Sequence, residues 1–315
     1  SQSNSYNKTM NKLFFMFLGK NPKLEKFLIE NKIDALSHSG SIGRYSKIKS
    51  FPWIPDFQEI NLPGNFSFKA RVQRRISHFN HIVNSTKIIV SSNTIRKDFK
   101  KISLAGYKKS EVIKHVNYVI PKKNIKSMNY LKKKYKIYKK FFLLPNHYWT
   151  HKNHSIVLDA LNYIKKKKFI IVSTGRCYDH RDPYYFKTFE KKIYEMELQN
   201  YYKIIGIVPF EDLCSLIYNS LGVINPSLSE GFPNSADQAS LLGKIAILSN
   251  IDVNLEEKRK NYFFFNPKNY KQLAKLLIIK ANMPKNLKYS KLDKSNLEKK
   301  YVNRYQNFIL KNFNK

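Results

Sequence analysis

The stretch PSLSEGFPNSADQASLLGKIAILSN, residues 226–250, decides the fold. The run just before it, LGVINPS, predicts a short buried strand, because Val223 and Ile224 are apolar and Pro226 ends the run. ADQASLLG predicts one or two helical turns that stop at Gly243, and KIAILSN predicts a second apolar strand. A strand, a loop, a helix and a strand in this order form a parallel βαβ unit.

The loop of this unit predicts a ligand site. Ligands of open parallel sheets bind beyond the carboxyl ends of the strands, which is where Glu230 falls in the sequence. The helix after it begins near Asn234 and Ser235, whose free backbone N–H groups can hold an anion. A purely structural interpretation stays open. Ser235 and Gln238 have the spacing of a capping box, and Glu230 could be a solvated loop acid.

The second half of the chain repeats the strand–helix order. Apolar strands are predicted at 141–146, 169–175 and 201–206, and helices at 155–167, 183–198, 210–220, 269–281 and 297–312. Strands that are apolar throughout are typical of a parallel sheet covered on both faces. The pattern therefore predicts an α/β fold with a doubly wound sheet.

The first half predicts shorter elements. A helix is expected at 24–32, strands at 33–39, 48–54 and 86–92, and a helix that Asn93 or Thr94 caps and that runs through Asp98. The lysine-rich run MNYLKKKYKIYKK, 128–140, is expected to be a solvated helix or linker. We therefore predict an N-terminal domain over 1–138, short at its start, a second domain over 139–295, and a closing helix over 296–315 that can cross back to the first domain.

The composition restricts the partners. The chain has 315 residues and a formal net charge of +36, but the excess consists of 49 lysines against nine arginines. Nucleic-acid readers favour arginine, so an anionic substrate or an anionic membrane surface suits this charge better than a specific nucleic acid. The two cysteines predict no disulfide framework or zinc site. No apolar run reaches the roughly 18 residues of a membrane span, and the apolar run at 11–20 is too short for a signal peptide. A cytoplasmic location is therefore expected. If a lipid is a partner, the chain would be peripheral to the inner face of the membrane.

Several segments, in the right order, resemble glycosyltransferase family 4. PSLSEGFPNSADQASLLGK resembles the Glu-x7-Glu strand–loop–helix of that family, and PNHYWTHKNHSIVLDAL resembles its Gly-Arg-x4-Lys segment. IIGIVPFEDLCSLIYNS is similar to the run that precedes the acidic motif, and IIVSSNTIRKDF to the element that closes the N-terminal domain. WIPDFQEINLP resembles the segment with the His-Asp loop, in a subgroup that has Pro-Asp-x-Gln.

The resemblance implies the GT-B fold, in which two Rossmann-like doubly wound domains face each other across a cleft. It also implies a retaining transfer of a sugar from a nucleotide-diphosphate sugar, with no metal or other cofactor. The acceptor implied is a surface polysaccharide or a lipid-linked glycan. Charge stabilisation of the leaving diphosphate is the physical task that the protein would perform.

The resemblance also assigns roles to individual residues. Glu230 and Asp56, with Gln58 beside it, would act at the reacting sugar, and Lys152 would neutralise the diphosphate. Gln238 stands where the family has its second glutamate and would contact the ribose. Donor binding would further involve His147 at the position of the family's arginine, Gly206, Asn234, Ser235 and Arg176. Pro55 falls near the position of the family's N-domain histidine.

Other interpretations stay open at this point. Lys152 and Arg176 could be surface residues, and Asp56 and Gly206 could serve turns. His151 and His154 flank Lys152, but without a nearby carboxylate pair they predict no metal site. As a whole the chain could be a non-catalytic homologue that binds a sugar nucleotide or a glycan as a scaffold. A basic nucleic-acid or membrane-surface binder is a third class, and charge alone supports it.

Overall fold

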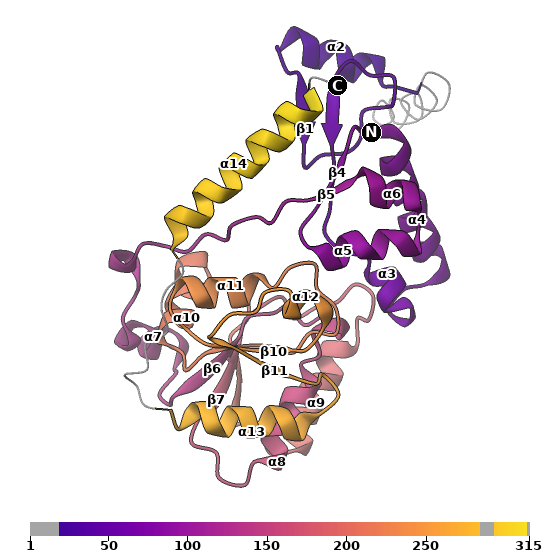
Figure 1. Ribbon diagram of the computed structural model, residues 1–315. Helices are drawn as coiled ribbons and strands as arrows, with labels where there is room; N and C mark the ends of the chain where they lie inside the picture. Colours follow the sequence, from indigo (N-terminus) through magenta and orange to yellow (C-terminus); the bar gives the residue numbers. More distant parts are fainter. Residues whose placement is uncertain (1–18, 284–292, 314–315) are drawn as a thin grey trace, which may run out of the picture. The chain divides into compact units, whose positions relative to one another are not determined.

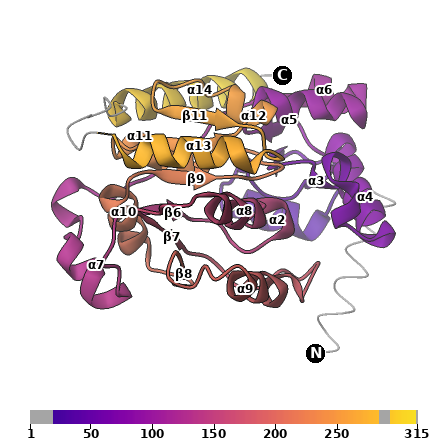
Figure 2. The same ribbon diagram turned by 90° about the horizontal axis from the view of Figure 1, so that it is seen from below.

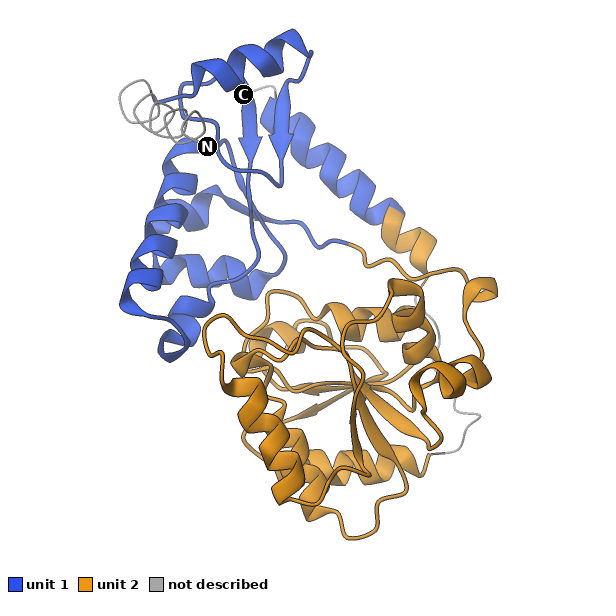
Figure 3. Ribbon diagram, turned by 180° about the vertical axis from the view of Figure 1, so that it is seen from behind, with its two compact units in different colours: residues 1–115, 299–315 blue, residues 116–298 orange. Residues whose placement is uncertain are grey.

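The structure, a computed structural model, describes residues 19–283 and 293–313 (Figure 1). The chain divides into two compact units, residues 1–115 with 299–315 and residues 116–298 (Figure 3). The division thus lies before residue 116, whereas the sequence predicted a boundary after residue 138. Val119, Ile120 and Leu131 explain this difference, because they pack in a hydrophobic cluster with the strands of the second unit.

Within the described residues of the second unit, six parallel strands form one sheet in the order β11-β10-β9-β6-β7-β8. Taken along the chain this is the doubly wound order 3-2-1-4-5-6, and its direction reverses between β6 and β9. The predicted doubly wound sheet is therefore confirmed, and β11 is a strand that the sequence analysis missed. The strands are β6 (Phe141–Leu144), β7 (Ile170–Ser173), β8 (Tyr202–Ile204), β9 (Val223–Asn225), β10 (Ala246–Ser249) and β11 (Tyr262–Phe265).

Helices cover both faces of this sheet (Figure 2). Successive strand residues point to opposite faces, so Phe142 and Leu144 join one core cluster and Phe141 and Leu143 the other. The first cluster includes α8 (Ser155–Tyr163), α9 (Tyr185–Glu195) and α13 (Tyr270–Ala281). The second includes α7 (Met128–Tyr135), α10 (Phe210–Asn219) and α11 (Asn234–Leu241), and the short α12 spans Asp252–Leu255.

The predicted βαβ unit of residues 226–250 is present. β9, α11 and β10 follow one another, and β9 pairs in parallel with β10. The helix ends at Leu241, and Gly243 just beyond it has φ +70°, a left-handed conformation that glycine adopts without steric cost. The predicted glycine stop of the helix is confirmed.

The described strands of the first unit are short and parallel. β1 (Ala35–Ser37) pairs with β2 (Lys49–Phe51), and β3 (Trp53–Ile54) pairs with β4 (Ile88–Val90), which pairs with β5 (Ser110–Val112). Pro52 separates β2 from β3 because proline has no N–H for a sheet hydrogen bond. Its carbonyl still accepts from the backbone N–H of Ile89 at 2.8 Å, so the chain passes from one pairing to the next at this residue.

Helices also cover both faces of the β3-β4-β5 sheet. Ile82 of α4 and Ile95 of α5 pack on one face, and Phe308 of α14 packs on the other, with its ring 5.0 Å from that of Phe51. Ser92 caps α5 through a bond from the N–H of Ile95, so the predicted cap at Asn93 or Thr94 was one or two residues too late. The helices are α2 (Pro22–Glu30), α3 (Gln58–Asn61), α4 (Phe68–Asn84), α5 (Asn93–Asp98), α6 (Leu104–Lys109) and α14 (Lys294–Phe313). Among the helices that the structure describes, none is long and apolar enough to cross a membrane.

Candidate active site

A cavity of about 300 Å³ lies in the second unit, at the carboxyl ends of the central strands. Its walls come from the loops after β6, β7, β8 and β9, next to the point where the strand order reverses. This is the place where open α/β sheets bind their ligands. Of the predicted site residues, the cavity brings together Glu230, Lys152, His147, Asn234, Ser235 and Gln238.

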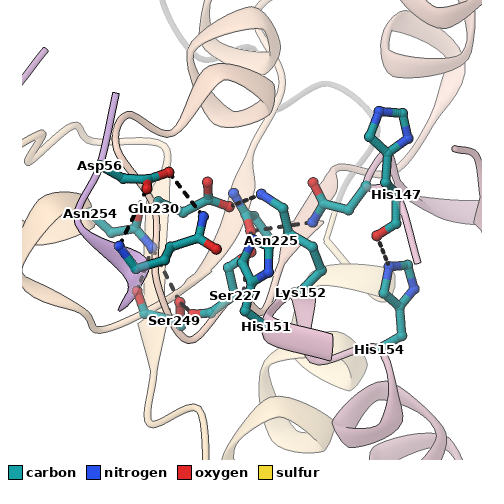
Figure 4. A network of polar contacts seen from close by, with 12 residues as sticks. Asp56, His147, His151, Lys152, His154, Asn225, Ser227, Glu230, Ser249 and Asn254 are labelled. Carbon is teal, nitrogen blue, oxygen red and sulfur yellow. Dashed lines mark hydrogen bonds and ion pairs between the residues drawn. The ribbon is translucent and has the colours of Figure 1, made fainter. Parts of the chain in front are cut away.

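Lys152 and Glu230 form an ion pair inside this cavity, with Nζ 2.7 Å from Oε1 (Figure 4). Their side chains are only 13% and 10% exposed. Lys152 ends a short 3-10 turn, Thr150–Lys152, and Asn153 after it is left-handed with φ +54°. Because both charges are shielded from water, their attraction exceeds that of a surface pair, although desolvation offsets part of it.

Backbone and amide contacts hold the two loops together. The backbone N–H of Leu228 donates to the carbonyl of His151 at 2.8 Å. The side-chain amide of Asn153 donates to the carbonyls of Pro226 and Pro267 at 3.2 and 2.9 Å. The positions of Lys152 and Glu230 are therefore fixed by the fold around them as well as by their own pairing.

A buried polar network lies beneath Glu230 (Figure 4). Asn225 at the end of β9 accepts, through Oδ1, bonds from the Ser227 hydroxyl at 2.6 Å and from the Asn146 amide at 3.3 Å. Asn254 donates to the carbonyl of Ser249 at 2.8 Å, and the Ser249 hydroxyl donates to the carbonyl of Ser227. Among the described residues the buried Oδ1 of Asn254 has no partner, but the other bonds of this network tie the loops after β9 and β10 together. The sequence analysis did not single out these residues, although Asn225 lies in the run that it predicted as a strand.

The amino end of α11 opens into the cavity, but not with the predicted capping box. Pro233 is the N-cap residue and supplies no side-chain cap bond. Ser235 is therefore the second helical residue, and among the described residues its buried hydroxyl has no hydrogen-bond partner. A capping box needs the serine at the N-cap and the glutamine three residues later, so this interpretation was wrong for Ser235 and Gln238.

His147 lines the cavity as a neutral ring. Its Nδ1 accepts a bond of 2.8 Å from the backbone N–H of Arg176, so the proton of the neutral ring is on Nε2. Burial lowers the pKa of His147, and the charges of Arg176 and Lys152 lower it further. The Arg176 side chain itself is exposed and does not line the cavity.

His154 and His151 are buried behind the cavity wall. His154 Nε2 donates to the carbonyl of His147 at 3.2 Å (Figure 4). Its Nδ1 accepts from the Tyr202 hydroxyl, also at 3.2 Å. Burial, followed by the charge of Lys152, lowers the pKa of each ring to about 3, so both rings are neutral at pH 7. Within the described residues, no group of three or more His, Cys, Asp or Glu side chains could hold a metal ion.

Gly206 lies beside the cavity and not in its lining, whereas its neighbours Ile207 and Val208 form part of the wall. Its φ of +69° favours glycine, although a Cβ there would meet no atom within 4 Å. Its carbonyl accepts from the backbone N–H of Gly175 at 2.8 Å, which joins the loops after β7 and β8.

Asp56 lies in the first unit, in a polar cluster of its own. It accepts from the Gln58 amide at 2.9 Å and from the Arg74 guanidinium at 3.2 Å. Glu59 beside it is bound by Arg74 at 2.7 Å and by His78 at 2.9 Å, and these partners outweigh its burial and lower its pKa to about 2. Arg74 and His78 were not predicted, because α4 was not recognised in the sequence. Glu59, on α3, was not singled out either.

Solved structures share this fold at low sequence identity. Anabaena Alr3699/HepE in complex with UDP-glucose has a TM-score of 0.62 and 19% identity over 75% of this chain and 64% of its own. Sucrose-phosphate synthase from Thermosynechococcus elongatus has a TM-score of 0.61 and 16% identity, over 75% of this chain and 59% of its own. A mutant of S. aureus TarM in complex with UDP has a TM-score of 0.62 and 14% identity, over 86% of this chain and 52% of its own. The chain thus spans less than two thirds of each. No curated protein matches the chain.

These neighbours show the GT-B fold, and with the parallel sheets of both units they confirm the predicted α/β class. The family model of glycosyl transferases group 1 matches residues 127–291, just over half of the chain and nearly all of the second unit. The segment includes every residue that lines the 300 Å³ cavity. On this match, the chain belongs to glycosyl transferases group 1.

Proposed function

We propose that the chain is a retaining glycosyltransferase of family 4. It moves a sugar from a nucleotide-diphosphate sugar to a surface polysaccharide or a lipid-linked glycan. The observation that supports this most is the shielded Lys152–Glu230 pair in a cavity beside the amino end of α11. A cation, a carboxylate and the amino end of a helix suit a donor with a diphosphate and a sugar.

Lys152 and α11 suit the leaving diphosphate. Negative charge develops on the phosphates as the bond to the sugar breaks, and a positioned cation stabilises that charge most in a site with little water. The first residues of α11, Asn234 and Ser235, line the same cavity, and the amino end of a helix favours an anion. In this proposal no metal is needed, since these groups supply the positive charge.

Glu230 suits the sugar. A carboxylate accepts hydrogen bonds from two hydroxyls at once. One of its oxygens is bonded to Lys152, so a diphosphate that takes the ammonium as its partner leaves that oxygen to a sugar hydroxyl. The pair thereby holds both side chains in place before the donor binds, which lowers the cost of ordering them.

The other donor contacts follow from the lining. Gln238 faces the ribose, and Ile207 and Val208 beside Gly206 offer an apolar wall to the base. His147 donates from Nε2 as a neutral group. Asp56 is assigned to the acceptor side by the resemblance of its loop, with Arg176 at the edge of the phosphate site. UDP-sugars are the first donors to test, because UDP or UDP-glucose is bound in two of the neighbours.

A second candidate, a non-catalytic homologue that binds sugar nucleotides or glycans, is favoured by His147. The family's arginine would bring a permanent charge to the phosphates, whereas burial, Arg176 and Lys152 all lower the pKa of this histidine. The site then has less positive charge for the transition state. Turnover of any donor would reject this candidate.

The amphipathic helix α4 has the features of a helix that binds a membrane surface. Phe68, Val72, Ile76 and Phe79 recur at helical spacing and are 74%, 40%, 64% and 64% exposed. The exposed Lys69, Arg71 and Arg75 lie among them, and the helix has no acidic residue. An apolar stripe flanked by cations is suited to the interface of an anionic bilayer. We therefore propose that α4 docks the enzyme on the membrane where a lipid-linked acceptor is held.

A panel of nucleotide-diphosphate sugars, assayed for nucleotide release with lipid-linked and polysaccharide acceptors, tests this function. We expect one donor to be turned over in the presence of a chelator. Binding of a sugar nucleotide without any release, across the panel and all acceptors, would favour the scaffold candidate instead.

A further inference from the structure

A second cavity, of about 590 Å³, lies at the opposite ends of the strands in the same unit. Its lining includes Phe141 at the start of β6, Leu221 just before β9, and Ile245 just before β10. These are the amino ends of the strands, whereas the donor cavity lies at their carboxyl ends. The two cavities have no lining residue in common among the described residues.

Lysines dominate this cavity. Among the described lining residues there are five lysines and no acidic side chain, so the formal charge of the wall is +5; they are Lys132, Lys139, Lys140, Lys244 and Lys280. They come from α7 and the segment after it, from the loop before β10, and from α13. The lysine-rich run at 128–140, which the glycosyltransferase site does not use, thus supplies three of the five.

Two of these lysines are held in place without a carboxylate. Lys244 donates to the carbonyl of Ser220 at 2.9 Å, and Lys280 places Nζ 3.2 Å from the centre of the Phe263 ring. Burial lowers the pKa of both ammonium groups. Across the described residues, neither forms an ion pair. An ammonium has three donors, so each retains donors for a ligand.

The negative ends of nearby helices offset only part of the positive charge of these lysines. α10, α11 and α13 all end near the cavity, and the carboxyl end of a helix attracts cations. Each end is equivalent to roughly −0.5 of a charge, so three ends supply about −1.5 against the +5 of the lysines. Most of the positive charge is therefore left for an anion.

Most of the remaining wall is apolar or aromatic, including Met128, Phe141, Tyr218, Leu221 and Ile245, and Asn219, Ser220 and Gly243 complete it together with Tyr138, Ala281 and Met283. The volume lies within the roughly 300–1,000 Å³ of small-molecule sites. A ligand that fits both parts of the wall bears several negative charges at one end and an apolar body at the other.

We propose that this cavity binds a phosphorylated amphiphile, that is, a pyrophosphate or phosphate monoester with an apolar group attached. Such a ligand could be free in solution or could be the headgroup end of a membrane lipid. The site lies apart from the proposed donor site and goes beyond the glycosyl transfer proposed above.

Calorimetric titration with geranyl pyrophosphate and with inorganic pyrophosphate tests the proposal. The Lys152→Ala protein is used throughout, so that the donor cavity contributes little. In the lining variant Lys132, Lys139 and Lys280 become Gln. In the control variant Lys165, Lys166 and Lys168, exposed lysines of the same unit, become Gln, with the same loss of charge.

We expect geranyl pyrophosphate to bind at least tenfold more tightly than inorganic pyrophosphate. We also expect the lining variant to weaken its binding tenfold or more and the control variant to change it less than twofold. Equal weakening in both variants, or no preference for the geranyl group, would overturn the proposal. If the lining variant melts early, the single Lys280→Gln variant is compared with Lys166→Gln under the same criteria.

A vesicle experiment distinguishes the two sources of the ligand. Vesicles of phosphatidylcholine with phosphatidic acid are added to the bound geranyl pyrophosphate. If the vesicles displace geranyl pyrophosphate, and the lining variant abolishes this effect, the ligand is a lipid headgroup. If geranyl pyrophosphate stays bound in the presence of vesicles, the ligand is free in solution. Donor turnover is measured separately, with Lys152 intact, and should be equal in the lining and control variants, so failure of this proposal leaves the glycosyltransferase proposal standing.

Discussion

Lys152 and Glu230, 78 residues apart in the sequence, meet at 2.7 Å where the strand order of the second sheet reverses. One follows β6 and the other follows β9, the two neighbouring strands on either side of the reversal. At such a switch point the loops after the two strands diverge and leave a crevice between them. Lys152 and Glu230 both line the 300 Å³ cavity at this place. The pair is thus a product of topology, and its chemistry can be tested one residue at a time.

Lys152→Ala should weaken the binding of a nucleotide diphosphate by roughly 1.5–3 kcal/mol, the range of a hydrogen bond to a charged group. Calorimetry measures this. Lys192→Ala is the matched control, because Lys192 forms a 2.8 Å pair with Asp159 in the same unit, away from the cavity lining. Unchanged affinity in Lys152→Ala, or complete loss of wild-type activity with a chelator, would contradict the metal-free assignment.

Gln238→Glu should leave the melting temperature within a degree or two of wild type, because Gln238 forms no cap on α11. Its activity should be equal or higher if the side chain contacts ribose hydroxyls, since a carboxylate accepts more strongly than an amide. Steady-state kinetics and a melting curve together check this. A large loss of stability with unchanged kinetics would restore a structural role for Gln238.

Acid should destabilise the folded chain from pH 6.5 downward. An unfolded histidine has a pKa near 6.5, whereas burial and then Lys152 lower the pKa of His151 and His154 to about 3 in the folded state. Between these values the unfolded state binds protons that the folded state does not. Stability is therefore complete above pH 7 and falls by up to about 1.4 kcal/mol per pH unit for each ring as pH falls toward 3.

His154→Gln isolates this contribution. The variant should be less stable at pH 7, because the buried bonds to Tyr202 and His147 are disturbed. Its free energy of unfolding should nevertheless fall less steeply than that of wild type between pH 6.5 and pH 5. Urea unfolding at several pH values measures the two slopes, and parallel slopes would refute the assignment of a neutral, buried His154.

The triple variant Phe68→Ser, Ile76→Ser, Phe79→Ser should reduce binding to anionic vesicles at least tenfold, because it removes the exposed apolar stripe of α4. Tyr184→Ser with Tyr194→Ser, which are 76% and 67% exposed on the other unit, is the control and should have little effect. Sedimentation with vesicles measures both. If the two variants bind alike, α4 is not the docking surface.

Most strands of the six-stranded sheet could be predicted from sequence because they are short, mainly apolar runs. β11, Tyr262–Phe265, is also such a run and was missed all the same. Phe141–Leu144 and Ile170–Ser173 are buried throughout, and such runs bounded by Pro, Asn or Gly are distinctive. The predicted residues that met in the cavity did so because the carboxyl ends of β6 and β9 are neighbours. α4 was missed although Phe68, Val72, Ile76 and Phe79 recur at helical spacing in the sequence. Only the structure shows that this stripe is exposed and does not face the core.

The details of the site depended on contacts that sequence spacing does not contain. The capping box failed because Pro233 occupies the N-cap and shifts Ser235 into the helix. The neutral state of His147 depends on the backbone N–H of Arg176, which lies on a different loop. Asn225 and Ser227 have no distinctive motif, and only their burial under Glu230 reveals their role.

Glu230→Gln, assayed for nucleotide release with the preferred donor and acceptor, tests the central claim most directly. Turnover should fall by roughly 10²-fold or more while nucleotide affinity and the melting temperature change little, because the carboxylate acts mainly on the sugar in the transition state. Asp159→Asn, which removes the carboxylate of the Lys192 pair, should keep wild-type turnover. Wild-type turnover by Glu230→Gln would contradict the account.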